Sequence, residues 1–144
     1  LSVNENQPKQ VIQMLNKFYK IEKNVLLLGL SFKPETDDIR ESSSIKILNL
    51  LISNGYKVTA NDPIAINNTI KVINHKNLNY TEFWKKEISK NNIIIIGTNW
   101  NEYTDLKNLL NNITSKKIII DCKRLFKSDE IKNHKYLTFG NSSK

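Results

Sequence analysis

The stretch VLLLGLSFKPETDDIRESSS, residues 25–44, predicts a strand, a loop and a helix in direct succession. The apolar run at 25–28 ends at Gly29, a polar loop carries Lys33 and Arg40, and the serines at 42–44 are suited to cap a helix. In open α/β sheets, ligands bind outside the carboxyl ends of the strands. Two cations at that place, beside a helix N-terminus, suit an anionic group, and phosphate fits best.

An amphipathic helix is predicted upstream of this stretch, with a cap at Asn4 or Asn6. Its apolar face consists of Val11, Met14, Leu15 and Phe18. A second helical stripe follows the loop and stops at the Asn54-Gly55 pair, as helices commonly do. The members of this stripe are Ile45, Leu48, Leu51 and Ile52.

Strands are predicted at 57–61, 93–96 and 117–121, with short ones at 71–73 and 136–139. The β-branched run at 93–96 is typical of a strand that is buried on both faces. Two more helices are expected, one beginning at Thr81 and one after residue 100. Their apolar positions are Phe83, Trp84 and Ile88 in the first, and Tyr103, Leu106, Leu110 and Ile113 in the second. Apolar strands alternating with amphipathic helices predict an α/β, Rossmann-like three-layer domain with a mostly parallel sheet and an extra leading helix.

The composition is that of an ordinary globular protein. The 144 residues fit one domain, with 39% hydrophobic and 25% charged residues. No apolar stretch approaches the roughly 20 residues that cross a bilayer, and no signal peptide is visible. A single cysteine cannot form an internal disulfide, which fits a reducing compartment. We therefore expect a cytoplasmic protein with no membrane contact.

The net charge of +8 raises the question of a nucleic-acid partner. The lysines are scattered among asparagines and isoleucines, and they form neither a basic stripe nor a pattern interleaved with aromatic residues. We expect no nucleic-acid partner.

The loop after the first strand lacks the glycines of a dinucleotide-binding turn. Gly29-Leu30-Ser31 does not match Gly-x-Gly-x-x-Gly, and the whole chain contains only four glycines. A self-sufficient NAD site is therefore not expected. Lys33 and Arg40 can bind phosphate, or they can neutralise the acidic residues beside them, and the pattern alone leaves both interpretations open. These acidic neighbours are Glu35, Asp37, Asp38 and Glu41.

Residues 29–42, GLSFKPETDDIRES, resemble the signature of the C-terminal, nucleotide-sugar-binding domain of the UDP-glucose/GDP-mannose dehydrogenase family. Further segments match in the expected order. Asn61-Asp62-Pro63 resembles the family's Tyr-Asp-Pro, and TNWNEY at 98–103 resembles its Thr-Glu-Trp-x-x-Phe segment. DCKR at 121–124 resembles its Asp-Gly-Arg-Asn or Asp-Gly-Arg-Arg loop. NENQPKQV at 4–11 resembles the helix that joins the family's two Rossmann domains.

The resemblance implies that the chain is the C-terminal, UDP-sugar-binding part of an NAD-dependent nucleotide-sugar 6-dehydrogenase. Such enzymes oxidise the C6 alcohol of a nucleotide-bound sugar to the carboxylate, for example UDP-glucose to UDP-glucuronate. Their N-terminal domain binds most of the NAD, and their cysteine nucleophile would lie upstream of Leu1. The isolated chain is therefore expected to be inactive.

The same resemblance divides the chain into the end of a linking and dimerisation helix at 1–22 and the nucleotide-sugar-binding domain at 23–144. A UDP-sugar or a GDP-sugar is the expected substrate, and a homodimer is the expected assembly of the complete enzyme. The alternative is a non-catalytic nucleotide-binding or dimerisation module.

Individual positions also take roles from this resemblance. Phe32 and Lys33 match residues that meet the sugar and phosphate of the substrate, and Arg40 matches an arginine that reaches the NAD. Lys123 stands where the family has an arginine that contacts the nucleotide sugar, and Arg124 follows it, so either cation is a candidate. No catalytic residue and no metal ligand are expected in this chain.

Five other residues receive a structural interpretation. Cys122 stands where the family has glycine, and it is expected to be an inert thiol because it follows a buried strand with no histidine nearby. His75 and His134 are too isolated to form a metal site. Trp84 and Trp100 are expected in the core or at an interface rather than as platforms for a ligand.

Overall fold

The computed structural model describes residues 2–18 and 22–139. Its helices and strands are, in chain order, α1 (Ser2–Asn16), β1 (Asn24–Leu28), α2 (Ser43–Ser53), β2 (Lys57–Asn61), α3 (Ile66–Ile70), β3 (Leu78–Tyr80), η1 (Trp84–Lys90), β4 (Ile93–Ile96), η2 (Asn101–Asp105), α4 (Leu106–Asn111), β5 (Ile118–Asp121), η3 (Ser128–Glu130) and β6 (Lys135–Thr138). The η elements are 3₁₀-helices. No helix in this part of the chain has the length and apolar character required to cross a membrane.

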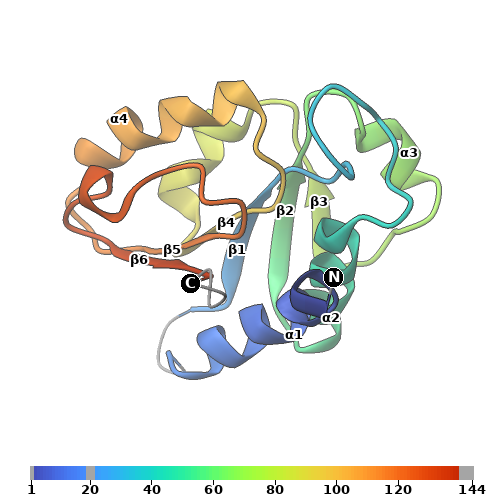
Figure 1. The fold of residues 1–144 in the computed structure, drawn as a ribbon, viewed down its shortest axis with the longest axis horizontal. Coiled ribbons are helices and arrows are strands. Elements are labelled where there is room, and N and C mark those ends of the chain that lie inside the picture. Colours follow the sequence, from blue (N-terminus) through green and yellow to red (C-terminus); the bar gives the residue numbers. More distant parts are fainter. Residues whose placement is uncertain (1, 19–21, 140–144) are drawn as a thin grey trace.

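Within the described residues the strands form one six-stranded, fully parallel sheet in the order β3-β2-β1-β4-β5-β6 (Figure 1). The register pairs Leu28 at the end of β1 with Asn61 of β2 on one side and with Ile96 of β4 on the other. Strands β2 and β3 are added on one side of β1, and β4, β5 and β6 are added on its other side, so the strand order reverses between β1 and β4. This strand order is that of a Rossmann-like fold, and the reversal is the point at which such folds bind ligands. The predicted α/β fold class is confirmed.

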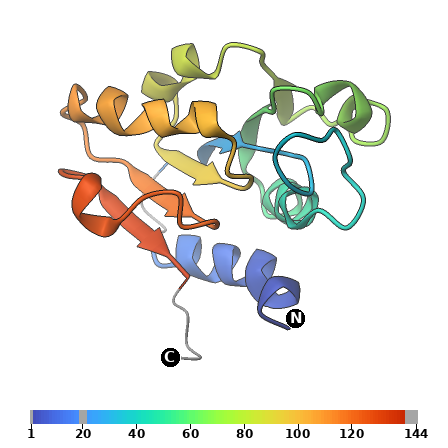
Figure 2. The same cartoon turned by 45° about the horizontal axis from the view of Figure 1, so that its top comes forward.

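Helices cover the sheet on both sides, which produces the three layers. Figure 2 shows α1 on one side of the sheet and α4 on the other. Alternate strand residues face opposite layers, because successive side chains of a strand point to opposite faces. The first core combines strand residues with α1 and α2 and includes Val11, Leu15, Val25, Leu27, Ile47, Leu48, Leu51, Ile93 and Ile95. The second combines strand residues with η1, η2 and α4 and includes Leu26, Leu28, Trp84, Ile94, Ile96, Tyr103, Leu106 and Leu110.

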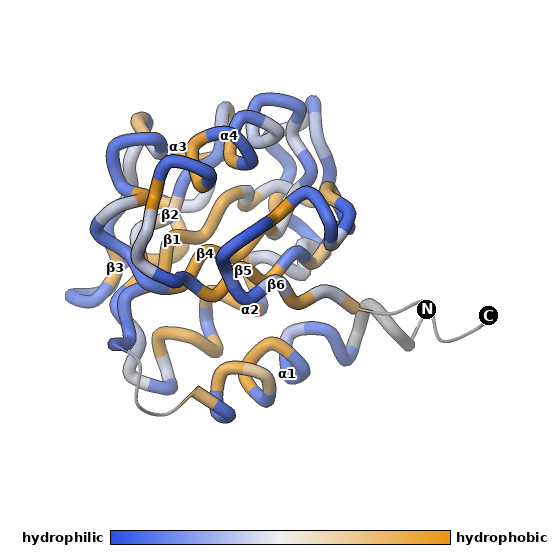
Figure 3. The backbone as a smooth tube through the Cα atoms, turned by 90° about the vertical axis from the view of Figure 1, so that its left-hand side faces the viewer, coloured by the Kyte–Doolittle hydropathy of each residue, from blue (hydrophilic) through white to orange (hydrophobic). Residues whose placement is uncertain are grey.

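The central strands are apolar over their whole length, as Figure 3 shows by the hydrophobic colouring of β1, β4 and β5. All four residues of β4 are buried, and so are all four of β5. Strands covered on both faces have this continuous apolar character, so the prediction of a buried strand at 93–96 is confirmed. Trp84 and Trp100 are buried in the second core, as expected.

Three predictions about elements are wrong. No helix begins at Thr81, because the 3₁₀-helix η1 starts at Trp84 and leaves Phe83 63% exposed. The leading helix begins at Ser2, so neither Asn4 nor Asn6 caps it, and it continues through Pro8. Residues 71–73 do not form a strand. The chain instead makes the short helix α3 and then the three-residue strand β3. Of the two apolar residues that suggested a strand, Val72 is 66% exposed in the turn after α3, and Ile73 is partly buried against the first core.

The division at residues 22 and 23 stays a prediction. The helix α1 lies within the proposed linking segment, and its residues Val11 and Leu15 are buried within the chain against the first core. Residues 1, 19–21 and 140–144, which that division also covers, lie outside the described residues.

Candidate nucleotide-sugar site at the carboxyl edge of the sheet

The chain leaves β1 through a tight turn at Gly29. This residue has a φ of 102°, and its backbone N–H donates to the Asn61 carbonyl at 2.8 Å. A Cβ at this position would lie 2.5 Å from the Cβ of Thr98. Glycine therefore serves both for its left-handed backbone and for the close approach of the segment that follows β4. The Thr98 hydroxyl in turn donates to the Ser31 carbonyl at 2.8 Å, which ties the two loops together.

The Asp62 carboxylate organises this edge of the sheet. It is buried at the end of β2 and accepts hydrogen bonds from the loops that follow β1, β2 and β4. Its donors, at 2.8–3.2 Å, are the backbone N–H groups of Leu30, Ser31, Ile64 and Ala65 and the indole N–H of Trp100. A carboxylate that accepts this many N–H groups fixes the backbone around it. From the sequence, Asn61-Asp62-Pro63 was visible only as a family likeness, and this role of Asp62 was not predicted.

Phe32 and Lys33 lie beyond the segment that Asp62 fixes. The Phe32 N–H donates to the Asp38 carbonyl at 2.7 Å and closes the loop on itself. The Ser31 hydroxyl donates to the Lys33 carbonyl at 2.8 Å. The Phe32 side chain is 49% exposed, and Lys33 is exposed as well. The loop therefore has a rigid base and presents an aromatic ring and an ammonium group to solvent.

Arg40, at the far end of the loop, pairs with Asp38. Its Nε donates to Oδ1 and its Nη2 to Oδ2, both at 3.0 Å, and these hydrogen bonds lower the pKa of the Asp38 carboxyl. The Arg40 side chain remains 86% exposed. Arg40 thus neutralises an acidic neighbour, which was one of the two interpretations of its sequence context.

Arg40 borders a hollow whose lining does not include Lys33. The hollow of about 510 Å³ beside Arg40 lies between the loop and α3, and the Asn68 side chain donates to the Asp37 carbonyl across it at 2.9 Å. Lys71 provides its second cation, and Lys33 is not among its lining residues. In Figure 1 this loop, coloured cyan, lies beside α3. The joint binding of one phosphate by Lys33 and Arg40 stays a prediction, and in this hollow it is Lys71 rather than Lys33 that lies with Arg40.

The loop after β5 is organised by a second buried carboxylate, Asp121. Its four donors, at 2.6–3.3 Å, are the backbone N–H groups of Lys123, Leu125 and Phe126 and the hydroxyl of Tyr136. Burial and the Asp121 carboxylate raise the pKa of Tyr136, so this hydroxyl keeps its proton. Arg124 has a φ of 53°, a left-handed conformation that is uncommon outside glycine and asparagine. Arg124 is exposed and Lys123 is partly buried.

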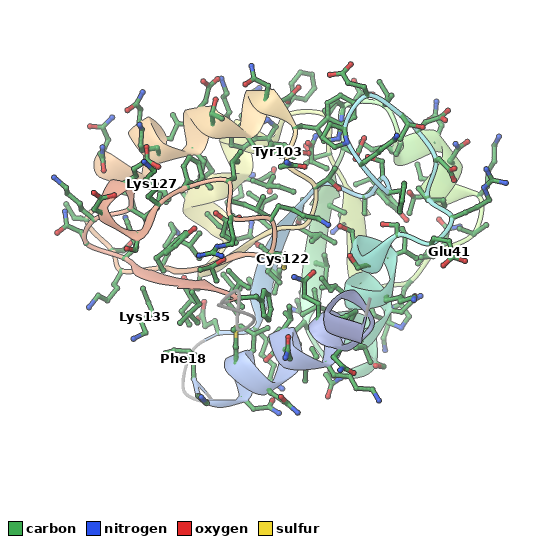
Figure 4. The ribbon with its side chains drawn as sticks, in the orientation of Figure 1. Phe18, Glu41, Tyr103, Cys122, Lys127 and Lys135 are labelled. Atoms are coloured by element: carbon green, nitrogen blue, oxygen red, sulfur yellow. The ribbon has the colours of Figure 1, made fainter. Side chains whose placement is uncertain are left out.

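Cys122 is a buried structural residue. Burial raises the pKa of its thiol to about 12, so it stays protonated near neutral pH and is a poor nucleophile. Figure 4 shows it near the centre of the molecule, whereas Glu41 lies at the right-hand margin where the first loop returns to α2. His134 is buried too, where Nδ1 accepts from the Lys117 N–H at 3.1 Å. Among the described residues, no group of three or more His, Cys, Asp or Glu side chains is placed to hold a metal ion.

The turn after β1 does not fit the diphosphate of a dinucleotide. In a dinucleotide-binding turn the backbone approaches the pyrophosphate closely and the helix N-terminus faces it. Here the N–H groups of Leu30 and Ser31 donate to Asp62, and the N-cap Ser42 donates its hydroxyl to the Leu30 carbonyl at 2.8 Å. The protein supplies its own anion to these donors, so an added diphosphate has to bind farther out on the loops.

The strand order and the loops at this edge define a class of protein, a Rossmann-like α/β domain of the kind that binds nucleotides at the carboxyl ends of its strands. Residues 26–128 match the UDP binding domain of the UDP-glucose/GDP-mannose dehydrogenase family, and the chain belongs to this family.

Individual relatives agree with this assignment. The UDP-glucose 6-dehydrogenase of Rickettsia bellii is 35% identical over 121 residues, which are 82% of this chain and 28% of that protein. The structure of a UDP-glucose dehydrogenase from Pyrobaculum islandicum superposes with a TM-score of 0.75 and 28% identity, covering 97% of this chain and 30% of that one. The UDP-N-acetyl-mannosamine dehydrogenase of Staphylococcus aureus, with a TM-score of 0.70, 23% identity and coverage of 99% and 32%, shares the fold. The chain thus spans less than a third of these relatives.

Proposed function

We propose that this chain is the substrate-binding part of an NAD-dependent nucleotide-sugar 6-dehydrogenase. The substrate would be a UDP-sugar such as UDP-glucose, whose C6 alcohol the complete enzyme oxidises to the carboxylate. The observation that carries the proposal is the pairing of two loops with cations at one edge of the sheet. They follow β1 and β5, which flank β4, and each is fixed at its base by a buried aspartate.

The proposed division of labour follows the exposure of the side chains. Phe32 would contact the sugar, and the mobile ammonium of Lys33 would bind the diphosphate. From the other loop, Lys123 or Arg124 would contact the nucleotide sugar. Both loops have rigid bases and solvent-facing cations, as a site for an anionic ligand requires.

NAD would be bound mainly by a separate N-terminal domain and would meet this chain at Arg40. The turn after β1 supports that separation, because its amide donors already serve Asp62. The 86% exposed guanidinium of Arg40 is free to exchange Asp38 for an anion presented from outside. With Cys122 protonated and buried, the chain offers no thiolate for the oxidation, so it is proposed to be inactive by itself.

The test is a calorimetric titration of the protein with UDP-glucose. We expect binding in the micromolar to millimolar range, and Lys33→Ala should weaken the affinity by about tenfold to a hundredfold, because hydrogen bonds to charged groups contribute about 1.5–3 kcal/mol. Lys57→Ala is the matched control, since it removes an exposed lysine at the opposite end of the sheet. An absence of binding at millimolar UDP-glucose, or equal affinities of the two variants, would contradict the proposal.

A further inference from the structure

Gln7 is a buried polar residue on the apolar face of α1. It precedes Val11 and Leu15 by four and eight positions, so the three side chains lie along one face of the helix. Gln7 is 4% exposed, and Val11 and Leu15 are fully buried in the first core. The helix therefore presents an amide to the interior at the place where an apolar side chain would continue its stripe.

The amide of Gln7 contacts the loop that carries Lys123. Its Nε2 donates to the backbone carbonyl of Cys122 at 3.1 Å, a contact between residues 115 positions apart. Cys122 directly follows β5, and its own N–H still donates to the Ile96 carbonyl of β4 at 3.0 Å. Gln7 thus acts at the point where the regular sheet ends and the loop begins.

The peptide group between Cys122 and Lys123 is held at both ends. Its oxygen accepts from Gln7, and its N–H donates to Asp121 Oδ1 at 3.3 Å. A peptide group is planar, so fixing both its oxygen and its hydrogen fixes the orientation of the whole plane. That plane determines the direction in which the chain enters Lys123 and then the left-handed Arg124.

When Gln7 makes this contact, the other polar atom of its amide is left unpaired. Its Oε1 is buried and has no hydrogen-bond partner among the described residues. A methionine of similar length would fill the same space without that oxygen, although it would leave the Cys122 carbonyl unpaired. The two effects on stability oppose each other. Packing alone therefore does not account for an amide at this position.

We propose that Gln7 is a positioning residue, through which α1 orients Lys123 toward the diphosphate or nucleoside of the substrate. This inference rests on the proposed function, and it selects Lys123 from the two candidate cations of the loop. It also makes α1 part of the substrate site without any contact between this helix and the ligand.

The decisive experiment is a double-mutant cycle on UDP-glucose affinity with Gln7→Met and Lys123→Ala. We expect Gln7→Met to weaken binding by about threefold to tenfold in the wild-type background, since a peptide hydrogen bond of ordinary strength is lost. In the Lys123→Ala background Gln7→Met should have no further effect, because the residue that it orients is gone. Gln13→Met, an exposed position on the same helix, is the control and should leave the affinity unchanged.

A second measurement separates this inference from the proposed function. Amide hydrogen exchange of Lys123 in the ligand-free protein should become at least about tenfold faster in Gln7→Met, with the midpoint of urea unfolding unchanged. If the wild type fails to bind UDP-glucose, the proposed function is wrong, while the exchange rate still tests whether Gln7 holds the peptide group between Cys122 and Lys123. An unchanged exchange rate at Lys123 would show that Gln7 does not hold this peptide group. An affinity loss of equal size in both backgrounds would show that Gln7 does not act on the substrate through Lys123.

Discussion

At the scale of single residues, two buried aspartates fix the backbone of the loops at the candidate site. Asp62 directly follows β2 and Asp121 is the last residue of β5, and each accepts hydrogen bonds from the N–H groups of a turning backbone. A carboxylate suits this task because its two oxygens together offer about four lone pairs. The exposed cations Lys33 and Arg124 are then presented from backbone that has little freedom to move.

Replacement of Asp62 by asparagine tests this arrangement. The amide keeps the shape of the side chain but offers only one acceptor oxygen, so at least two of the five N–H donors lose their partner. We expect the free energy of unfolding to fall by about 2–6 kcal/mol, at about 1–3 kcal/mol for each buried group left unpaired. Urea unfolding of the wild type and of the variant measures this difference in the free energy of unfolding. Asp105→Asn, which removes only an exposed pair with Lys85, should change stability by less than about 1 kcal/mol. Equal losses for the two variants would refute the special role of Asp62.

The sequence indicated which loops carry the candidate residues better than it indicated the geometry of these loops. Lys33 and Arg40 were recognised as candidates because cations after a strand are visible in the chain. The bidentate pairing of Arg40 with Asp38 was one of two equal possibilities, since the pattern does not specify side-chain rotamers. Gln7 was missed altogether. Its partner lies 115 positions away, and no local pattern distinguishes it from the other glutamines of α1.

At the scale of elements, the contact between α2 and the end of β4 brings the helix close to the sheet. The N-cap Ser42 accepts from the Ile45 N–H at 3.4 Å, and Ser44 in the first turn lies against Gly97. A Cβ on Gly97 would collide with the Ser44 hydroxyl and approach the Gly29 carbonyl at 3.1 Å. The glycine is therefore needed for space rather than for an unusual backbone angle.

Gly97→Ala should lower the free energy of unfolding by about 1–3 kcal/mol, because an added methyl group in a filled space forces its neighbours to move. Ser44→Ala removes the colliding oxygen, so it should recover part of this loss when the two changes are combined. Thermal or urea unfolding of the two single variants and the double variant gives the coupling. Strict additivity of the two changes would show that the space is not limited by Ser44.

The elements themselves were predictable wherever the apolar pattern was strong. The strands at 57–61 and 93–96 and the second helix with its Asn54-Gly55 end match the structure. The strand at 93–96 is apolar throughout because it is buried throughout, whereas the helix shows its buried side by the spacing of its apolar residues. The segment at 64–80 failed for a physical reason. Its strand β3 has three residues at the sheet margin, of which only Leu78 is buried, so it leaves almost no pattern.

At the scale of the whole molecule, one sheet couples two cores. The residues of α1 belong to the first core, whereas Trp84 and Trp100 both belong to the second. Side chains from the same strands contribute to both, so the loss of packing on one face weakens the support of the other. Single domains of this size usually unfold in one transition.

Leu15→Ala tests whether α1 shares in that cooperativity. Truncation of this fully buried side chain should lower the free energy of unfolding by about 2–5 kcal/mol, as it does for other buried leucines. The transition followed by tryptophan fluorescence, which reports the second core, should shift to lower urea as far as the transition followed by circular dichroism. Lys17→Ala, on the exposed end of the same region, should leave both unchanged. A fluorescence midpoint that stays in place while the circular dichroism signal changes would mean that α1 unfolds as a separate unit.

The hydrogen bonds from Thr98 to the Ser31 carbonyl and from Trp100 to Asp62 have a consequence for the order of assembly. During synthesis β1, its loop, α2 and β2 leave the ribosome well before residues 98–100, because chains emerge from the N-terminus onward. The early half has its own helix and strand pair and most of the contacts of the loop after β1, yet the contacts from Thr98 and Trp100 form only after β4 is placed beside β1. This loop is thus completed late, and in a nascent chain that ends before Trp100 the proposed sugar-nucleotide site is unfinished.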